Sequence, residues 1–457
     1  MIFHTLSERN NADIMIIKRE IIKQLAVWKS KKGRQPMILK GARQIGKTWI
    51  LKEFGMQYFD STAYFNFEEI QELKDVFATT KNVERILGQL ALYTNVPILP
   101  EKTLIIFDEI QECNDALNSL KYFCENAPEY AVVAAGSLLG VMLSKGGSFP
   151  VGKVDFLQMY PVSLKEFLAA ESPDLFNYIE QIDTIEELPS IIFNRLTESY
   201  KKYQVSGGMP QAVVQLLDNK GVGEVDVILQ NILNAYSLDF SKHANTKDIP
   251  RITSIWNSIP SQLAKENRKF VYKLVKSGAR AREYEDALLW LQDTGLVYRV
   301  FSNKKPFLPL TAYDDISAFK IYLSDIGLLR RLAKLAPDTI LNENSLYTEF
   351  KGAMAENYVL QSLVTQFEVS PRYWTSDGKA EVDFIIQSNN DIIPVEVKSG
   401  HATSGKSLSV YNSLYTPKLR IRYSVNNLKQ DGNLLNIPIF LADWTKKFVG
   451  DCIYAES

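Results

Sequence analysis

The octapeptide GARQIGKT, residues 41–48, constrains the fold more than any other stretch of this sequence. It matches the phosphate-loop pattern G-x-x-x-x-G-K-[ST] in full. The apolar segment PMILK leads into it, and the segment TWILKEF after it predicts a helix that ends at Gly55. A loop between a strand and a helix directs backbone N–H groups and the positive end of the helix dipole toward a phosphate chain. We therefore predict a phosphate-binding loop and disfavour a chance glycine-rich turn.

The residue types in this loop suit different tasks. We expect Lys47 to bind the β- and γ-phosphates of ATP and the Thr48 hydroxyl to hold Mg²⁺. The glycines allow the backbone to wrap around the phosphates. The predicted nucleotide-binding residues are Gly41, Ala42, Arg43, Gln44, Ile45, Gly46, Lys47 and Thr48. ATP and Mg²⁺ are the ligands that this loop predicts.

A pair of carboxylates follows a second apolar strand. In TLIIFDE, residues 103–109, four apolar residues precede Asp108 and Glu109. Ligands bind at the carboxyl ends of buried strands in α/β folds. We predict that Asp108 joins the Mg²⁺ shell and that Glu109 orients and deprotonates the attacking water. Ser137 ends another apolar strand; it suits contact with the γ-phosphate or the water, and a small residue in a tight turn is the alternative.

Short apolar strands alternate with helical segments over the first part of the chain. We predict strands at 36–41, 62–68, 103–109 and 131–137. Near-continuous apolar strands that alternate with helices are typical of a parallel sheet covered on both faces. The predicted fold class is therefore α/β, beginning with a P-loop NTPase domain built on a parallel sheet. Residues 160–215 favour helices, with SGGMP at 206–210 between two of them.

Length and composition limit the other interpretations. A chain of 457 residues is too long for one core. Its 52 basic and 53 acidic side chains give a net charge of −1, so any contact with nucleic acid must come from a local patch. Three cysteines without metal-ligand spacing are typical of a reducing compartment. We find no signal peptide and no apolar run long enough to cross a bilayer, so we expect a cytoplasmic protein without a membrane partner.

The stretch 268–301 predicts two helices around a Ser-Gly turn and then a strand, an order typical of a winged helix. Its second helix is expected to bury Ala281, Tyr284, Leu288 and Leu291. Between residues 265 and 282 there are seven basic residues and one acidic residue, which suits phosphate contact. The open face of the second helix instead carries Glu283, Glu285 and Asp286. DNA binding and packing against the phosphate-loop domain both stay open.

Four residues of the C-terminal part follow the order of a metal-dependent nuclease site. Glu356 falls on the apolar stripe of a predicted helix, where an acid needs a cation or a metal beside it. The stretch 380–400 predicts two strands joined by a turn, with Asp383 on the first strand and Glu396 and Lys398 on one face of the second. Two or three carboxylates with a lysine can hold Mg²⁺ and hydrolyse a phosphodiester. We therefore predict a mixed α/β, restriction-endonuclease-like domain.

Two other interpretations of this stretch stay open. Glu396 and Lys398 also suit an ordinary ion pair on one strand face, which contributes little when it is exposed. Alternatively, the domain has kept a nuclease-like fold and lost its chemistry, which leaves a DNA-binding or scaffolding module.

Longer motifs give the chain a family resemblance. PMILKGARQIGKTWILKEFG, TLIIFDEIQEC, AAGSLLG, VDFLQMYPVSLKEFL, VSGGMPQAV, FKIYLSDIGLL and EVKSG occur in this order. The chain thereby resembles the AAA-type P-loop ATPases that carry a C-terminal domain of unknown function with a restriction-endonuclease-like, PD-(D/E)xK, pattern. The resemblance implies an additional-strand P-loop fold, a winged helix, and Ser137 in the sensor position.

The chain departs from this family at one point. Relatives often have Gly-Arg where this sequence has Gly152 and Lys153. A lysine lacks the planar fork with which an arginine binds phosphate oxygens, so an arginine acting from here on the γ-phosphate is in doubt. We expect Arg43, inside the loop, to face a neighbouring group instead.

These predictions divide the chain into an N-terminal helix at 1–35, an AAA-type P-loop ATPase domain at 36–215, a winged-helix-like domain at 216–340 and a nuclease-like domain at 341–457. We expect ATP hydrolysis to reposition the later domains, with DNA as a target and a homo-oligomer as a further expectation. The rival prediction is a nucleotide-regulated binding switch or scaffold whose nuclease-like domain is inactive.

Overall fold

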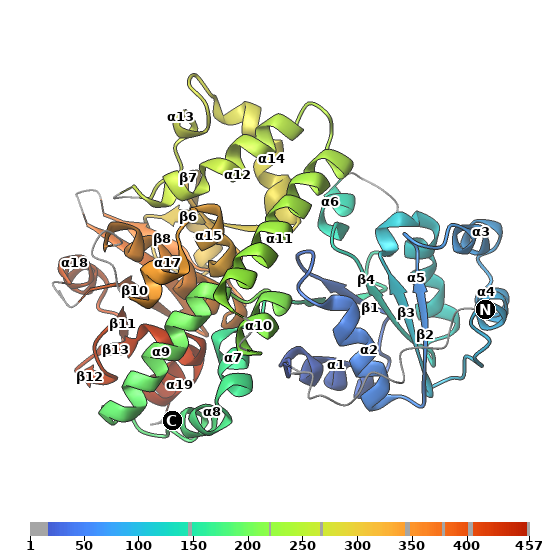
Figure 1. Cartoon of the computed structure of the whole chain (residues 1–457), viewed down its shortest axis with the longest axis horizontal. Helices are drawn as coiled ribbons and strands as arrows, with labels where there is room; N and C mark the ends of the chain where they lie inside the picture. Colours follow the sequence, from blue (N-terminus) through green and yellow to red (C-terminus); the bar gives the residue numbers. More distant parts are fainter. Residues whose placement is uncertain are drawn as a thin grey trace.

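The computed structural model describes residues 17–454, except for 145–148, 219–220, 266–267, 343–347, 377–379 and 401–404. Figure 1 shows two bodies of secondary structure, each built on its own β-sheet, with long helices between them. Most of the predicted N-terminal segment 1–35 lies before or around α1 (Ile21–Ser30), and residues 1–16 are outside the described part.

The first sheet has five parallel strands in the order β2-β3-β4-β1-β5. Its strands are β1 (Met37–Lys40), β2 (Ser61–Asn66), β3 (Thr103–Asp108), β4 (Ala131–Ala135) and β5 (Asp155–Gln158). The segments that connect them contain α2 (Lys47–Tyr58), α3 (Glu72–Thr79), α4 (Val83–Thr94), η1 (Ile110–Glu112), α5 (Asn114–Asn126) and α6 (Leu139–Ser144). The predicted parallel sheet of a P-loop NTPase fold is thus confirmed.

The central strands are apolar throughout because packed side chains cover both of their faces. All residues of β3 and β4 are buried. In β3, Leu104 and Ile106 belong to one buried apolar cluster, whereas Ile105 and Phe107 belong to another. Successive side chains of a strand point to opposite faces, so this division places one cluster on each side of the sheet. The parallel strands then end together at one edge, next to the phosphate loop.

Two details of this domain differ from the prediction. Helix α2 does not end at Gly55 but continues to Tyr58. A Cβ atom on Gly55 would lie 2.2 Å from Thr62 Oγ1, so the glycine allows α2 to pack closely against β2. The edge strand β5 is absent from the predicted strands, because it alternates half-buried and exposed residues and lacks a continuous apolar run.

Helices lead from the first sheet to the second. They are α7 (Leu164–Glu171), α8 (Pro173–Glu180), α9 (Ser190–Ser206), α10 (Pro210–Leu217), α11 (Val222–His243), α12 (Ile249–Leu263), α13 (Tyr272–Val275) and α14 (Ala281–Asp293). The SGGMP segment separates α9 from α10. In α14, Tyr284, Leu288 and Leu291 are buried as expected, but Ala281 is exposed because it is the first residue of the helix.

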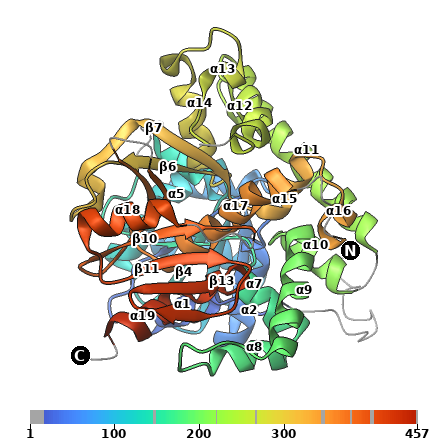
Figure 2. The same cartoon turned by 90° about the vertical axis from the view of Figure 1, so that its left-hand side faces the viewer.

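The second sheet is mixed and has eight strands in the order β12-β13-β11-β10-β9-β8-β6-β7. Its strands are β6 (Val297–Asn303), β7 (Asp314–Leu323), β8 (Arg372–Thr375), β9 (Glu381–Ser388), β10 (Asp391–Val397), β11 (Arg420–Ser424), β12 (Lys429–Asp431) and β13 (Leu434–Pro438). The helices of this part are α15 (Ile326–Leu332), α16 (Pro337–Leu341), α17 (Thr348–Gln366), α18 (Lys406–Tyr415) and α19 (Thr445–Tyr454). Figure 2 faces this sheet, and the predicted mixed α/β C-terminal domain is confirmed.

The β6–β7 hairpin joins the middle of the chain to its C-terminal part. Strand β6 pairs with β7 along its length and with β8 through Ser302 and Asn303. One sheet therefore runs across the predicted boundary at 340/341, and the division into four parts remains a prediction. In the ranges that the structure describes, no helix is long and apolar enough to span a membrane.

Candidate nucleotide-binding site

The phosphate loop joins β1 to α2 in a conformation that depends on glycine. Gly41 and Gly46 have φ angles of 149 and 92, and Gln44 lies between them with a φ of 65. A Cβ atom on Gly41 would lie 2.4 Å from the carbonyl oxygen of Met159, after β5. Glycine at position 41 therefore lets the loop pass close to this carbonyl. The loop then enters the N-terminus of α2, whose first residue is Lys47.

Lys47 is buried, and its ammonium group is hydrogen-bonded inside the loop. Nζ donates to the carbonyl oxygens of Gly41 over 2.9 Å and of Ala42 over 2.8 Å. Burial lowers the pKa of Lys47 to about 8, against the attraction of Glu109 and Asp108. A phosphate group would add the negative charge that a buried ammonium favours. The loop thus fits the phosphate chain of a nucleotide.

Thr48 and Asp108 meet at the end of β3. Thr48 Oγ1 donates to Asp108 Oδ2 over 2.7 Å, and the Tyr64 hydroxyl on β2 donates to the same oxygen over 2.8 Å. Burial and the neighbouring Asp108 raise the pKa of Tyr64, so its hydroxyl stays protonated as a donor. Mg²⁺ prefers hydroxyl and carboxylate oxygens as protein ligands. Thr48 and Asp108 therefore fit a magnesium ion that a bound nucleotide would share.

Glu109 leaves β3 in a left-handed backbone conformation, with a φ of 48. Residues other than glycine seldom adopt this conformation, and it recurs at functional sites. The Glu109 carboxylate accepts a hydrogen bond from Gln111 Nε2 over 2.5 Å. Glu109 is half-buried and, like Asp108, attracts the Lys47 ammonium, so its carboxylate lies near the phosphate loop.

Ser137 lies two residues after the end of β4, which pairs with β1. Its side chain is buried, and its Oγ has no hydrogen-bond partner among the described residues. Ser137 lines the same cavity as Gly41 and Ala42. A buried hydroxyl without a partner costs about 1–3 kcal/mol, which a ligand oxygen can offset. The structure thus brings Ser137 to the phosphate loop, while its contact with a phosphate or a water stays a prediction.

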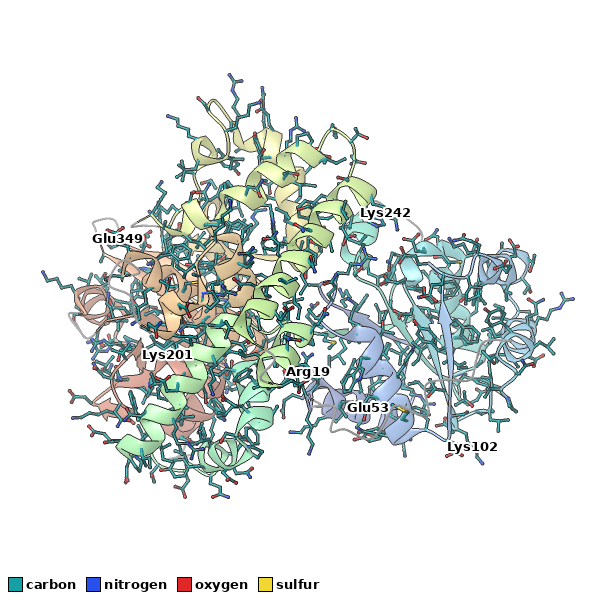
Figure 3. All side chains as sticks on the ribbon, viewed as in Figure 1. Arg19, Glu53, Lys102, Lys201, Lys242 and Glu349 are labelled. Atoms are coloured by element: carbon teal, nitrogen blue, oxygen red, sulfur yellow. The ribbon has the colours of Figure 1, made fainter. Side chains whose placement is uncertain are left out.

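Arg43 points out of the loop toward α11. Its guanidinium pairs with Asp239 and, over 3.5 Å, with Glu68. The Tyr236 hydroxyl donates to the Arg43 carbonyl oxygen over 2.8 Å. Lys242, labelled near the end of α11 in Figure 3, pairs with Glu68 over 2.7 Å. These contacts fasten the long helix α11 to the phosphate loop.

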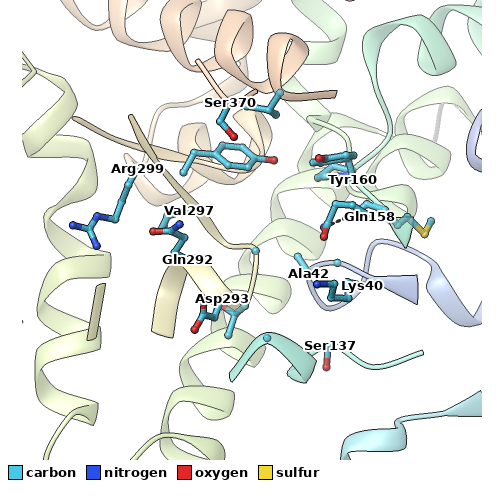
Figure 4. A pocket seen from close by; sticks show the side chains of 18 of the residues that line it. Lys40, Ala42, Ser137, Gln158, Tyr160, Gln292, Asp293, Val297, Arg299 and Ser370 are labelled. Carbon is cyan, nitrogen blue, oxygen red and sulfur yellow. Dashed lines mark hydrogen bonds between the residues drawn. The ribbon is translucent and has the colours of Figure 1, made fainter. Parts of the chain in front are cut away.

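The turn after α14 packs against the same loop. A Cβ atom on Gly295 would lie 3.4 Å from the Ala42 backbone nitrogen. Next to this contact is a cavity of about 340 Å³, shown in Figure 4. Its lining comes from all three parts of the chain and includes Lys40, Gln158, Tyr160, Asp293, Arg299 and Ser370. The loop therefore lies where the phosphate-loop domain, the middle helices and the C-terminal part meet.

Glu356, the first predicted nuclease residue, is buried in α17 and paired with a cation. Its carboxylate binds the guanidinium of Arg268 and accepts a hydrogen bond from the Tyr322 hydroxyl over 3.0 Å. The pKa of Glu356 is raised above its ordinary value, because burial and the nearby Asp383 outweigh the opposite effect of Arg268 and Lys320. The cation that this buried acid requires is thus an arginine from the segment before α13.

Asp383 and Glu396 lie on the antiparallel strands β9 and β10, and Lys398 directly follows β10. The pairing of Phe384 with Val395 puts Asp383 opposite Glu396. Directly opposed residues of an antiparallel pair point to the same face. Glu396 is 3% exposed and its Oε1 pairs with Lys398 Nζ over 3.1 Å. One partner of this ion pair, Glu396, is therefore buried, so the pair differs from an exposed surface ion pair.

These four residues gather in one region without forming a metal shell. Among the residues that the structure describes, no group of three or more His, Cys, Asp or Glu side chains is arranged to hold a metal ion. Asp383 Oδ2 instead accepts a hydrogen bond from the Val397 backbone over 2.8 Å. The Arg268–Glu356 pair removes one of the carboxylates from such a shell.

The remaining basic candidates are distributed as follows. Lys153 precedes β5, at the edge of the parallel sheet opposite the loop, and pairs with Glu125 over 3.0 Å. It is therefore not placed to act on a phosphate in its own loop. Lys273, Lys276 and Arg280 are exposed around α13.

Three residues that contact the predicted sites are missing from the sequence prediction. Tyr64 is a hydroxyl-bearing residue in an apolar strand, and Gln111 follows Glu109 by two positions; both features are visible in the sequence. Arg268 is one of many basic residues in its segment, and it meets Glu356 across 88 positions. Contacts over such separations come from the tertiary fold, so no local pattern indicates this pair.

The strand order, the glycine-dependent loop and the Thr48–Asp108 contact together define a P-loop nucleotide-binding domain. Residues 33–168 match the family model described as an AAA domain. This part of the chain therefore has a P-loop NTPase fold and is similar to the AAA domain family. Residues 197–339 and 351–440 match the models of two domains of unknown function, DUF8612 and DUF4143. No curated protein matches the chain.

Several solved structures are similar in fold. The Walker-type ATPase of Pyrococcus abyssi is 13% identical, with a TM-score of 0.46, covering 69% of this chain and 96% of that one. The RuvB Holliday junction branch migration motor of Thermotoga maritima is 14% identical, with a TM-score of 0.30 and coverages of 62% and 90%. The ORC1 protein of Aeropyrum pernix in complex with DNA is 12% identical, with a TM-score of 0.27 and coverages of 71% and 90%. At these TM-scores the likenesses carry no further argument.

Proposed function

We propose that this chain binds ATP with Mg²⁺ in the loop 41–48 and hydrolyses it. The observation that carries the proposal is the 2.7 Å hydrogen bond from Thr48 to Asp108, with Glu109 next in the chain. It brings two magnesium-type ligands and a candidate base to the strand end beside the loop. The match of residues 33–168 to the AAA domain family supports the same activity.

In this proposal each polar group of the loop has one task. Lys47 moves its hydrogen bonds from the carbonyl oxygens of Gly41 and Ala42 to β- and γ-phosphate oxygens. Because the phosphate oxygens are charged, these hydrogen bonds are stronger. Thr48 and Asp108 hold Mg²⁺, which neutralises charge on the phosphates when it is bound. Ser137 donates its unpartnered hydroxyl to a γ-phosphate oxygen or to the water.

Glu109 acts as the general base. It takes a proton from a water molecule as the water oxygen attacks the γ-phosphorus. The bond between this phosphorus and the bridging oxygen breaks, its electron pair stays on ADP, and inorganic phosphate leaves. The half-buried position of Glu109 supports this role, because the carboxylate is accessible to water yet shielded from bulk solvent.

We further propose that the nucleotide cycle repositions the middle and C-terminal parts. Arg43 in the loop pairs with Asp239 of α11, and the Tyr236 hydroxyl binds the Arg43 carbonyl. A nucleotide that moves the loop must therefore stretch or release contacts to α11. DNA is the proposed target, because Lys273, Lys276 and Arg280 stand exposed around the short helix before α14, in a helix-helix-strand order that suits a winged helix.

A homo-oligomer is part of the proposal. Lys153 of the same chain lies at the sheet edge opposite the loop and already pairs with Glu125. The proposed source of an arginine that acts on the γ-phosphate is therefore a second copy of this chain.

Two substitutions separate binding from hydrolysis. Lys47→Ala should abolish ATP binding measured by calorimetry, because the loop loses its only ammonium group, whereas the exposed Lys32→Ala should leave it unchanged. Glu109→Gln should bind ATP like the parent and lose hydrolysis by a factor of about 10² or more, because an amide cannot take the proton. A parent that binds ATP and never turns it over would favour the rival, a nucleotide-regulated switch.

A second candidate function is DNA cleavage by the C-terminal sheet. It is favoured by the placement of Asp383 opposite Glu396, with Lys398 directly after the strand that carries Glu396. Cleavage would require Arg268 to release Glu356, because the two are paired. Asp383→Ala should then abolish Mg²⁺-dependent cleavage and leave ATP turnover intact. Absence of cleavage by the parent on single-stranded, duplex and branched DNA would instead support an inactive, scaffolding domain.

A further inference from the structure

We propose that Gln111 is a positioning residue for ATP hydrolysis: it orients the attacking water together with Glu109. The inference rests on the proposed function and adds a residue that neither the loop pattern nor the carboxylate pair indicates. It is carried by two observations: the contact between Gln111 and Glu109, and two buried polar atoms, Gln111 Oε1 and Ser137 Oγ, that have no partner among the described residues.

The contact between Gln111 and Glu109 fixes the orientation of the amide. Gln111 lies in η1, the short helical turn directly after Glu109. Its Nε2 donates to Glu109 Oε2 over 2.5 Å. A carboxylate only accepts hydrogen bonds, so the amide nitrogen must face Glu109 and the amide oxygen must point the other way. The direction of Oε1 is thus set by chemistry.

The amide oxygen points to the end of β4. A Cβ atom on Gly136 would lie 2.1 Å from Gln111 Oε1, so the oxygen rests against the backbone of Gly136. This oxygen is buried and accepts no hydrogen bond from the described residues. The next residue is Ser137, whose buried Oγ also has no partner among them. Buried polar groups are paired in nearly all native structures, so two adjacent exceptions indicate where polar ligand atoms belong.

The two unpartnered atoms differ in what they can bind. Gln111 Oε1 is an acceptor, whereas the Ser137 hydroxyl can donate. A water has two protons: one can go to Glu109, and the other can be donated to Gln111 Oε1. The remaining lone pair of the water is then directed by both side chains, as a glutamine directs the attacking water in some other P-loop enzymes. Ser137 is left to donate to a γ-phosphate oxygen.

Gly136 leaves the space that the Gln111 amide occupies. Any side chain at position 136 would displace the Gln111 amide. Because Oε1 is the end of a flexible side chain, Gly136→Ala should shift Gln111 without unfolding the strand. This variant therefore moves the Gln111 amide while the side chains of Gln111 and Glu109 are both still present.

The test compares Gln111→Leu and Gln111→Glu with the parent in the full chain. Gln111→Leu removes both hydrogen bonds and should lower kcat at least tenfold, with affinity for a non-hydrolysable ATP analogue within twofold of the parent. Gln111→Glu replaces the amide donor with a carboxylate, which cannot donate to Glu109, so kcat should fall by a similar factor while the analogue affinity stays within twofold of the parent. Gln89→Glu, an exposed change of the same charge on α4, should change neither quantity.

Gly136→Ala keeps the inference testable if a Gln111 variant does not fold. It should reproduce the loss of kcat without a loss of analogue affinity. A parent that hydrolyses ATP while Gln111→Leu, Gln111→Glu and Gly136→Ala all keep the parental kcat would overturn the inference and leave the proposed function standing. A parent without turnover would overturn the proposed function and this inference with it.

Discussion

Three buried charged side chains lie where parts of the chain meet, and each is stabilised by a different kind of partner. Lys47 uses two loop carbonyls, and Glu356 uses the guanidinium of Arg268. Asp325, at the start of α15, uses backbone N–H groups: Gly208 donates to it over 2.5 Å and Leu328 over 2.9 Å. Burial nevertheless raises the pKa of Asp325 to about 6, because the cost of desolvating the carboxylate exceeds what these N–H donors return.

Asp325 predicts a pH dependence of stability whose sign follows from this shift. The ordinary pKa of 3.8 describes the unfolded chain, so between about pH 3.8 and 6 the folded state binds more protons. The contribution of Asp325 is therefore fully present below about pH 3.8 and is lost as the pH rises through about 6. Its size is on the order of 3 kcal/mol.

Asp325→Asn tests this dependence, because an amide does not titrate. The free energy of unfolding, measured by urea denaturation, should change less between pH 4 and pH 6 in this variant than in the parent. The difference should be up to about 3 kcal/mol over this range. The exposed Asp338→Asn should leave the slope unchanged. An Asp325→Asn variant with the parental slope would contradict the account of this junction.

At the level of single residues, the sequence predicts what is encoded locally. The loop 41–48 and the pair Asp108 and Glu109 follow from a contiguous pattern after an apolar strand, and the structure brings them together. Gln111 has the same local origin, yet its significance depends on its contact with Gly136, which only the tertiary structure defines. Arg268 and Glu356 meet across 88 positions, so their pairing was not predictable from spacing.

At the scale of elements, burial decides which strands the sequence reveals. Strands β3 and β4 are buried throughout and read as continuous apolar runs. The edge strand β5 is half solvent-exposed, so its composition resembles that of a loop. Strand β6 matches the strand predicted after the second helix of 268–301, but its membership of the C-terminal sheet rests on two residue pairs with β8.

The short element α13 and its neighbours carry the exposed basic residues of the middle part. If they meet DNA, the affinity should fall with salt on a slope of roughly 0.9 per phosphate contact. Reversing the charge of Lys273 and Lys276 should reduce that slope by roughly 2, because two contacts are lost. The same reversal at the exposed Lys102 and Lys121, in the phosphate-loop domain, is the matched control. A slope that the first pair does not alter would leave α13 and α14 as packing elements.

At the scale of the whole molecule, the phosphate loop lies where all parts of the chain meet. Helix α11 is fastened to it through Arg43, and the turn after α14 packs on Ala42. Asp325 links the SGGMP turn to α15, which packs on α17 of the C-terminal part. A change at the loop can therefore reach the second sheet through packed elements, which is the physical basis of the proposed coupling.

The most direct test of the central claim is the steady-state release of phosphate from ATP by the full chain, measured with and without duplex DNA. The account predicts release that requires Mg²⁺, is lost in Glu109→Gln and increases when DNA is added. Release no greater than that of Glu109→Gln, under both conditions, would contradict it.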